Sequence, residues 1–285
     1  MYEQFFGLKE DPFRMTPDPK YLYLSKRHLE ALSSIHYGIE RRKGFIEITG
    51  EVGAGKTTLC RSFLSQLKPN IKCALIFNPF LSEMQILRTI IDDFGIKGKL
   101  RTKKDYFDAI NCFLLEQNAQ GNNVVVIIDE AQNLAPKVLE QIRLLSNLET
   151  ETEKLLQIIF FGQPELRELL RQPSLVQLRQ RISIRYHLTA LNQEEMIEYV
   201  HHRLIVAGAQ EGTIVFTPKA FSVMFEYTKG IPRLVNILSD KVLMVAYVNE
   251  TRQITYQLAE EAVYELEGIR PPEHQHVENL IKITV

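Results

Sequence analysis

The sequence feature that most restricts the fold is a glycine-rich segment placed directly after a short apolar run at residues 45–48. It fits the pattern G-x-x-x-x-G-K-[ST], whose glycines allow positive φ, so that successive backbone N–H groups converge on phosphate oxygens at the start of a helix. The segment consists of Gly50, Glu51, Val52, Gly53, Ala54, Gly55, Lys56, Thr57 and Thr58. In such a loop Lys56 would neutralise phosphate charge and Thr57 would ligate Mg²⁺. The pattern therefore predicts a strand, a phosphate-binding loop and a helix, with a nucleoside triphosphate as the expected ligand.

Length and composition restrict the class of protein further. With 285 residues, of which 45% are hydrophobic and 24% charged, the chain has an ordinary globular composition and room for about two domains. The net charge of −1 argues against a surface built as a whole to hold nucleic acid. No apolar run approaches the roughly 18–20 residues that span a bilayer.

The cysteines indicate the redox compartment. Cys60, Cys73 and Cys112 lack C-x-x-C spacing, which favours reduced thiols. We therefore expect a cytoplasmic protein, with any membrane association peripheral and made through a partner.

Positive charge gathers in one basic segment between residues 97 and 104. Its cations are Lys97, Lys99, Arg101, Lys103 and Lys104, and no acid follows before Asp105. Either a solvated loop or a contact with an anionic partner explains such a cluster.

Short apolar runs alternate with helical patterns through the first two thirds of the chain, which predicts a parallel sheet with crossover helices. Five strands are expected, near Gly44–Thr49, Cys73–Asn78, Val124–Asp129, Leu156–Gly162 and Ile182–Leu188. The third is continuously apolar, as in a central strand covered on both faces. Helices are expected near Ser25–Arg42, Thr57–Leu67, Glu83–Phe94, Lys104–Asn118 and Pro136–Asn147.

After about Ala190 the pattern becomes all-helical, which predicts a small helical lid. Asn192 and Glu195 have the spacing of a capping box that opens a helix to about Ala207. Thr217 and Pro218 read as the cap and first residue of a second helix, ended by Gly230. Pro232 starts a third helix, and Thr255–Leu266 supplies a fourth. Residues 269–285 are expected to form a flexible tail or a partner-binding segment.

Two acids close the predicted third strand, at the sheet edge where ligands bind in such folds. Asp129 suits Mg²⁺ coordination, and Glu130 suits the general base that polarises an attacking water. After the fourth strand Gln163 would contact either the γ-phosphate or the water, or simply serve a turn.

Three arginines are candidates for stabilising charge on the transferring phosphoryl group. Arg179 and Arg181 precede the last strand, where either would reach a neighbouring subunit's nucleotide in a ring, or lie on an ordinary surface. Arg233 follows Pro232 at a rigid helix start, from which it would reach toward the phosphates and couple the lid to hydrolysis.

With these motifs in order, the sequence resembles the AAA+ ATPases, and within them the ExeA type (general secretion pathway protein A). The resemblance covers residues 1 to about 268 and includes an opening that is not part of the general phosphate-loop pattern. That opening runs through Tyr2, Phe5-Phe6-Gly7-Leu8, Pro12-Phe13, Thr16-Pro17-Asp18-Pro19 and Tyr21-Leu22-Tyr23-Leu24-Ser25. The pilus ATPase MshM and ATPases linked to polysaccharide export look like the same branch. ExeA carries a membrane span and a peptidoglycan-binding region after its ATPase module, and we expect neither in the sequence given.

The resemblance implies an α/β fold: a P-loop NTPase core with a five-stranded parallel sheet, and a C-terminal all-helical lid. It implies an ATPase core over residues 1–189 that includes an N-terminal nucleotide-pocket segment, a lid over 190–268 and the tail over 269–285. By the same resemblance Asp129 and Glu130 form the Walker B motif, Gln163 stands at sensor 1 and Arg233 at sensor 2. Arg179 or Arg181 is then the arginine finger of a homo-oligomer. Phe13 would line the adenine pocket, although core packing explains a buried aromatic residue equally well.

These features together predict an ATP-hydrolysing AAA+ protein that assembles or remodels a bacterial envelope machine for secretion, pilus formation or polysaccharide export. An inner-membrane secretion or pilus protein is its expected partner, and nucleic acid is a weaker one. Two alternatives stay open. A DNA-associated transposition-type ATPase of the TniB kind shares much of the core, and a nucleotide-locked scaffold would use ATP only to set oligomer geometry.

Overall fold

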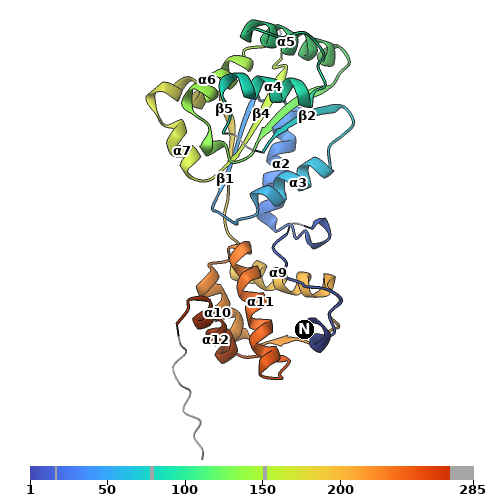
Figure 1. Ribbon diagram of the computed structural model, residues 1–285, viewed down its shortest axis with the longest axis vertical. Coiled ribbons are helices and arrows are strands. Elements are labelled where there is room, and N and C mark those ends of the chain that lie inside the picture. Colours follow the sequence, from blue (N-terminus) through green and yellow to red (C-terminus); the bar gives the residue numbers. More distant parts are fainter. Residues whose placement is uncertain (17, 78–79, 150–152, 270–285) are drawn as a thin grey trace, which may run out of the picture. The chain divides into compact units, whose positions relative to one another are not determined.

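The computed structural model describes residues 1–16, 18–77, 80–149 and 153–269, so the predicted tail lies, apart from Ile269, outside the described residues. The chain divides into two compact units. One is an α/β unit, Leu22–Ala190, and the other is a helical unit that joins Met1–Tyr21 to the residues from Leu191 onward. Figure 1 shows the sheet of the first unit and the helices of the second.

A five-stranded parallel sheet forms the centre of the α/β unit, as predicted. Its strands are β1 (Phe45–Gly50), β2 (Ile71–Ile76), β3 (Asn123–Ile128), β4 (Leu156–Gly162) and β5 (Ile182–Leu188). Their order across the sheet is β2-β3-β4-β1-β5, and every neighbouring pair is parallel. The second strand begins two residues earlier than predicted because Ile71 pairs with Asn123, and the predicted end at Asn78 lies outside the described residues.

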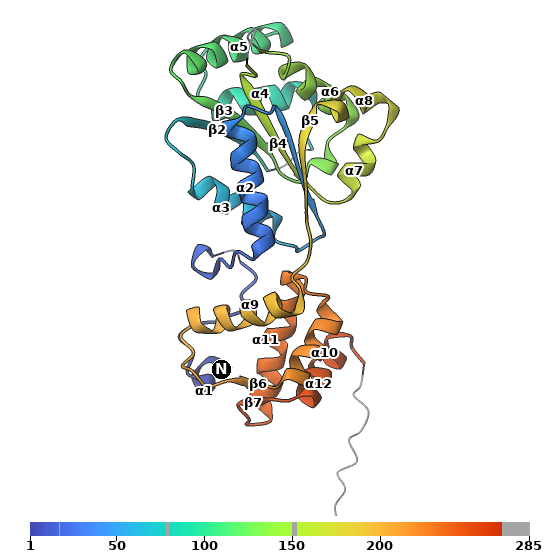
Figure 2. The ribbon, with the colours of Figure 1, turned by 180° about the vertical axis from the view of Figure 1, so that it is seen from behind.

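Both faces of the sheet are covered by apolar side chains, which explains the continuous apolar run of β3. Val125, Ile127 and Phe161 pack with helices α2 (Lys26–Glu40) and α3 (Lys56–Ser65) on one face. Figure 2 shows α2 crossing this face. Val124, Val126 and Phe160 pack on the other face against the remaining helices. These are α4 (Glu83–Asp93), α5 (Lys103–Ala119), α6 (Pro136–Leu145), α7 (Glu165–Leu170) and α8 (Val176–Arg181).

The five helices predicted in this unit are present, within a few residues of the predicted bounds. Side-chain caps define their starts where the sequence offers them. Ser82 and Thr102 each form a capping box with the residue three positions on, at the starts of α4 and α5. The two helices that the sequence did not predict, α7 and α8, have six residues each. Helices that short depend on packing rather than on their own sequence.

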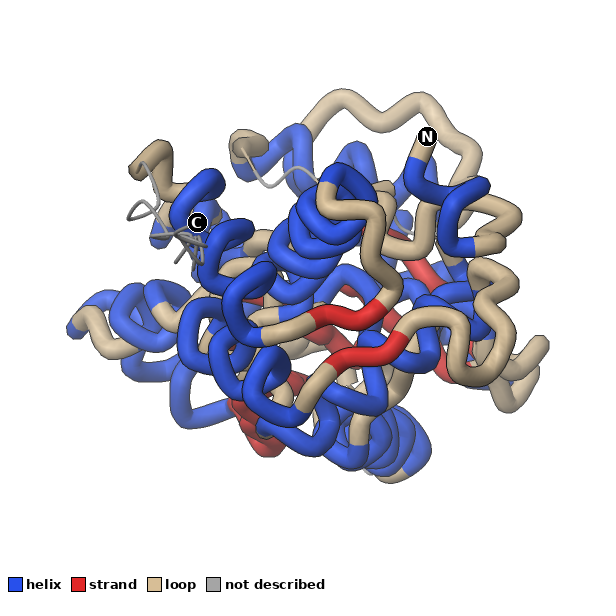
Figure 3. Tube along the Cα trace, turned by 90° about the horizontal axis from the view of Figure 1, so that it is seen from below, coloured by secondary structure: helices blue, strands red, loops and turns tan. Residues whose placement is uncertain are grey.

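The helical unit contains the four helices predicted from the sequence. They are α9 (Gln193–Val206), α10 (Pro218–Thr228), α11 (Pro232–Val248) and α12 (Tyr256–Leu266). The capping box of Asn192 and Glu195 is present, and Thr217 caps α10 with Pro218 in its first turn. Two short strands were not predicted, β6 (Val215–Phe216) and β7 (Gln253–Ile254). They pair in parallel. Figure 3 draws strands in red among the blue helices.

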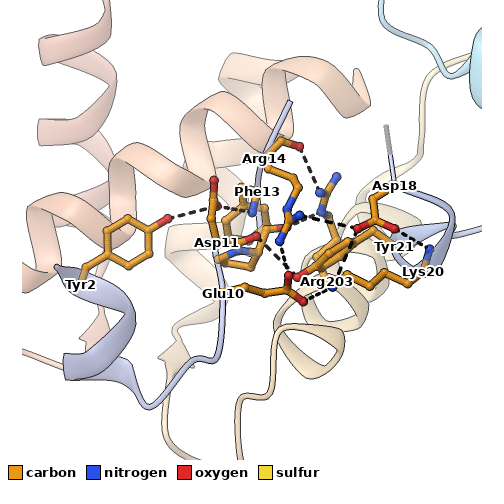
Figure 4. A network of polar contacts seen from close by, with 10 residues as sticks. Tyr2, Glu10, Asp11, Phe13, Arg14, Asp18, Lys20, Tyr21 and Arg203 are labelled. Carbon is orange, nitrogen blue, oxygen red and sulfur yellow. Dashed lines mark hydrogen bonds and ion pairs between the residues drawn. The ribbon is translucent and has the colours of Figure 1, made fainter. Parts of the chain in front are cut away.

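The N-terminal segment packs within the helical unit, whereas the sequence assigns it to the ATPase core. It contains α1 (Tyr2–Phe6) and the short turn Pro19–Tyr21. Arg203 of α9 holds it, because this buried guanidinium donates hydrogen bonds to the Pro12 and Arg14 carbonyls at 2.5 and 3.2 Å. The same guanidinium lies 4.8 Å from the ring centre of Tyr21 (Figure 4). Sequence pattern could not reveal this docking, because it depends on contacts about 190 residues apart.

A second set of contacts ties the same segment to α11. Tyr2 donates hydrogen bonds to Asp240 at 2.5 Å and to Asp11 at 3.3 Å, and Asp11 in turn accepts from the Phe13 backbone N–H. Burial raises the pKa of the Asp240 carboxyl, which the nearby charge of Asp11 raises further. The side chain of Phe13 is 2% exposed and fills the core of this unit.

Among the described glycines of the helical unit, Gly230, between α10 and α11, has the least room for a side chain. Its φ is +72°, and a Cβ added there would lie 1.9 Å from the Leu191 carbonyl oxygen. Gly212 has nearly the same φ, +75°, but a Cβ there would meet nothing within 4 Å. An alanine at either position would have the same strained φ, but only at Gly230 would its side chain also clash with backbone atoms. Comparing the two variants therefore separates the cost of the strained φ from the cost of the clash.

We expect Gly230→Ala to destabilise the helical unit by about 3 kcal/mol or more, since a backbone oxygen cannot move aside as a side chain can. Gly212→Ala, the control, should cost only about 1–2 kcal/mol, the price of a left-handed residue. Urea denaturation followed by circular dichroism measures both. Equal losses for the two variants would show that the Leu191 contact is unimportant.

Candidate nucleotide-binding site

The glycine-rich segment forms a loop between β1 and α3, as predicted. Gly53 and Gly55 have φ values of +79° and +99°, which only glycine adopts at little cost. Gly55 also has to lack a side chain, because a Cβ there would lie 2.6 Å from Nε2 of the buried His28. The loop therefore brings backbone N–H groups to the first turn of α3, where an anion is favoured.

Lys56 bends back over this loop. Its ammonium donates hydrogen bonds to the carbonyls of Gly50 and Glu51 at 2.8 and 2.9 Å, and the residue is only 6% exposed. Burial lowers the pKa of Lys56, against the opposing influence of the nearby Glu130 and Asp129 carboxylates. A phosphate in the loop would supply negative charge to a cation that is held here mainly by neutral carbonyls.

Asp129 lies directly after β3, and its buried carboxylate is 3.5 Å from the Thr57 hydroxyl. Burial raises its pKa, while the hydrogen bond that its Oδ1 accepts from the Glu130 backbone N–H at 3.0 Å acts in the opposite direction. A hydroxyl and a carboxylate side by side are the hard oxygen donors that Mg²⁺ prefers, together with phosphate oxygens and water. The residues present thus fit a magnesium ion.

Glu130 is held by two side-chain amides. Its Oε2 accepts hydrogen bonds from Gln132 Nε2 at 2.6 Å and from Gln163 Nε2 at 3.0 Å. Gln132 also accepts from the Gln163 backbone N–H at 3.0 Å, so the three residues form one network between the ends of β3 and β4. The backbone of Glu130 has a φ of +52°, uncommon for a residue with a side chain. Such conformations concentrate at functional positions.

Gln132 is a site residue that the sequence analysis did not identify. It follows the two acids by only a few positions, in the segment Asp129-Glu130-Ala131-Gln132, and that closeness was the available signal. Its bond to Glu130 is local, but its bond to Gln163 depends on β3 and β4 lying side by side, which only the strand order determines.

The two candidate finger arginines differ in what they contact. Arg181 donates hydrogen bonds to Ser146 Oγ at 3.0 Å and to Asn147, which commits its guanidinium to its own chain. Arg179 is exposed, and no side-chain hydrogen bond or ion pair is recorded for its guanidinium among the described residues. The structure therefore distinguishes two positions that the sequence left equivalent.

The remaining candidates lie elsewhere in the described chain. Arg233 is an exposed residue in the first turn of α11, after Pro232, as the sequence predicted, and its role stays a prediction. The basic segment is partly helical, because Thr102 caps α5 and Lys103 is its first residue. Lys103 pairs with Glu83 at 2.6 Å, so it belongs to a surface ion pair rather than to a free loop.

Comparison with known proteins agrees with this geometry. Residues 39–170 match the family of AAA domains. The chain is 48% identical over 271 residues to General secretion pathway protein A of Aeromonas hydrophila, covering 95% of this chain and 49% of that protein. The chain thus spans about half the length of this relative.

Solved structures with the same fold include the ORC2 protein of Aeropyrum pernix in its ADPNP–ADP complexes. That structure has a TM-score of 0.63 and 19% identity, over 90% of this chain and 72% of that chain. The RuvB Holliday junction branch migration motor of Thermotoga maritima has a TM-score of 0.53 and 19% identity, over 85% and 69%. At such identities these likenesses concern the fold alone.

The fold and the loop define a P-loop protein of the AAA+ class. Within this class the chain is similar to General secretion pathway protein A over 95% of its own length, which confirms the resemblance drawn from its opening residues and phosphate loop. Among the described residues no helix is both long enough and apolar enough to cross a membrane.

The amide network makes a prediction for Gln132. Gln132→Leu removes one donor to Glu130 and the acceptor of the Gln163 N–H, so Glu130 loses its fixed orientation. We expect ATP turnover to fall about tenfold, a typical effect of misplacing a catalytic group. Nucleotide affinity should stay within about twofold, because the hydrogen bonds of the Gln132 amide go to Glu130 and Gln163, outside the phosphate loop. Phosphate release and a fluorescent-nucleotide titration measure the two quantities, and a loss of affinity equal to the loss of turnover would contradict this role.

Proposed function

We propose that this protein hydrolyses ATP and uses the cycle to assemble or remodel a bacterial envelope machine, such as a secretion, pilus or polysaccharide-export complex. The observation that carries the catalytic part is the placement of Glu130, held by two amides beside the Asp129–Thr57 pair and the Lys56 loop. The part that concerns secretion rests on the 48% identity to General secretion pathway protein A.

Each residue of the site has a role in this proposal. The loop Gly50–Thr58 binds the phosphates through backbone N–H groups, and Lys56 neutralises their charge. Thr57 and Asp129 hold Mg²⁺, which when bound supplies further neutralisation of the phosphate oxygens. Glu130 accepts a proton from the attacking water, and Gln163 orients that carboxylate and responds to the nucleotide state.

We assign the arginine finger to Arg179 rather than Arg181. The guanidinium of Arg181 is occupied within its own chain, whereas that of Arg179 is exposed at the end of α8. An exposed arginine at this place would complete the site of a neighbouring copy, where a finger is worth roughly 10³–10⁵ in rate. The protein would then act as a homo-oligomer, with Arg233 linking the helical unit to the nucleotide. A peripheral position at the cytoplasmic side of the inner membrane, bound to a secretion or pilus protein, fits this role.

Binding and turnover should be separable. Lys56→Ala is expected to lose nucleotide affinity, because it removes the only cation that bends over the loop in the described site. Glu130→Gln should keep ATP bound but hydrolyse it at least about a hundredfold more slowly, the usual contribution of a general base. Fluorescent-nucleotide binding and phosphate release test the two variants. Wild-type turnover in Glu130→Gln would refute the general base, whereas ATP binding without turnover in the wild-type protein would leave the scaffold alternative.

The finger assignment predicts complementation between subunits. Arg179→Ala should be slow on its own, and so should Glu130→Gln, but an equimolar mixture should exceed the sum of their separate rates. The gain arises because a Glu130→Gln copy supplies its intact Arg179 to the site of an Arg179→Ala copy, whose Glu130 is intact. Arg181→Ala is the control. It should lower the stability of the protein, and mixing it with Glu130→Gln should not raise turnover above the sum of the separate rates. Turnover that is independent of protein concentration in a proven monomer would exclude a finger acting in trans.

A further inference from the structure

A charged side chain is buried within the sheet, away from the phosphate loop itself. Glu47 lies on β1, the strand that leads into the loop, and it is 2% exposed. A carboxylate in such a place is strongly disfavoured unless opposite charges and hydrogen bonds compensate it. Nothing in the proposed ATP chemistry uses Glu47, so its presence in an interior strand of the sheet needs another explanation.

Two arginines compensate this carboxylate from different elements. Arg167 of α7 places Nε 3.3 Å from Glu47 Oε1, and Arg185 of β5 places Nε 3.2 Å from Glu47 Oε2. Glu47 and Arg185 are direct neighbours in the β1–β5 ladder, so this second pair follows from the strand register. The side chains of Arg167 and Arg185 are 37% and 45% exposed, whereas the Glu47 side chain between them is buried.

The two arginines differ in one respect. Arg185 uses a second nitrogen, Nη2, to donate a hydrogen bond to the backbone carbonyl of Arg179 at 2.5 Å. Arg167 has no recorded contact with that backbone among the described residues. Arg185 thus joins the strand that enters the phosphate loop to the last turn of α8, and it does so through its two separate donors.

This contact with the Arg179 carbonyl matters because the side chain of Arg179 is the proposed arginine finger. Arg179 is exposed, and the backbone from which it projects sets the point and direction in which its side chain leaves the helix. The carbonyls at the end of a helix also lack partners within the helix, and a guanidinium is well suited to bind them. The Glu47–Arg185 pair therefore holds the peptide from which the finger side chain leaves.

We propose that Arg185, oriented by Glu47, is a positioning residue for Arg179, and so acts on ATP turnover in a neighbouring copy rather than in its own site. This inference rests on the proposed trans role of Arg179. It also gives the buried Glu47 carboxylate a role. Glu47 and Gly50 lie on the same strand, β1, so within one copy the strand that leads into the phosphate loop also holds the finger arginine.

The test uses Arg185→Lys with Arg167→Lys as its matched control. Lysine keeps a positive charge for Glu47 in both variants, but one ammonium cannot reproduce the fork that reaches both Glu47 and the Arg179 carbonyl. We expect Arg185→Lys to lower kcat at least tenfold, with KM and fluorescent-ATP affinity within twofold of wild type. Arg167→Lys should keep kcat within twofold, and thermal melting should show that both variants are folded.

Mixing then decides whether the defect acts in trans. Arg185→Lys combined in equal amount with Glu130→Gln should exceed the sum of the separate rates, because Glu130→Gln copies supply a correctly held Arg179. A merely structural role for Arg185 would not be restored in this way. Equal kcat for Arg185→Lys and Arg167→Lys, or a defect that mixing leaves unchanged, would overturn the inference.

Arg179→Ala, measured in the same series, separates this inference from the proposed function. If Arg179→Ala is slow and is restored by mixing while Arg185→Lys is not, the finger stands and only the positioning role is wrong. If Arg179→Ala turns over ATP like the wild type, the finger assignment is wrong and the positioning role falls with it.

Discussion

The arrangement of the site depends on the backbone hydrogen bonds that place β1 between β4 and β5. This insertion sets Thr49 opposite Gly162 on one side and opposite His187 on the other. The phosphate loop therefore leaves the sheet next to the end of β4, where Gln163 follows. Since β3 pairs with the far side of β4, Asp129 and Glu130 reach the same edge. A different strand order would leave each motif intact and separate them in space.

Charge is concentrated where these strand ends meet. Lys56, Asp129 and Glu130 lie close enough for their charges to act on one another, and burial shifts the pKa of Lys56 downward and that of Asp129 upward. Both shifts arise because each charged form is partly deprived of water, which disfavours the charged forms of Lys56 and Asp129. In the proposed function these charged groups face a triphosphate and a magnesium ion instead of pairing only with one another. The Glu47 pair differs, because two arginines already balance it.

Several elements followed directly from the sequence. Five strands and the principal helices were predicted, since the apolar runs and the capping residues are local signals. The short helices α7 and α8 were missed, because neither has enough residues to show a helical period. The N-terminal segment was assigned to the ATPase core, while Arg203 and Asp240 bind it within the helical unit. Gln132 was missed for a related reason, as its partner Gln163 comes from another strand.

The sequence by itself determined the phosphate loop, the acidic pair after the third strand and the positions of the helix starts, because each rests on residues close together in the chain. Only the tertiary structure distinguished Arg179 from Arg181, since that difference lies in partners contributed by α6 and the residues that follow it. Only the tertiary structure explained Glu47, which reads in the sequence as one acid in an apolar strand. The physical reason is the same in both cases: the state of a charged side chain is set by the groups that surround it. The register of β1 and β5 brings Arg185 to Glu47, and the chain after α6 brings Ser146 and Asn147 to Arg181.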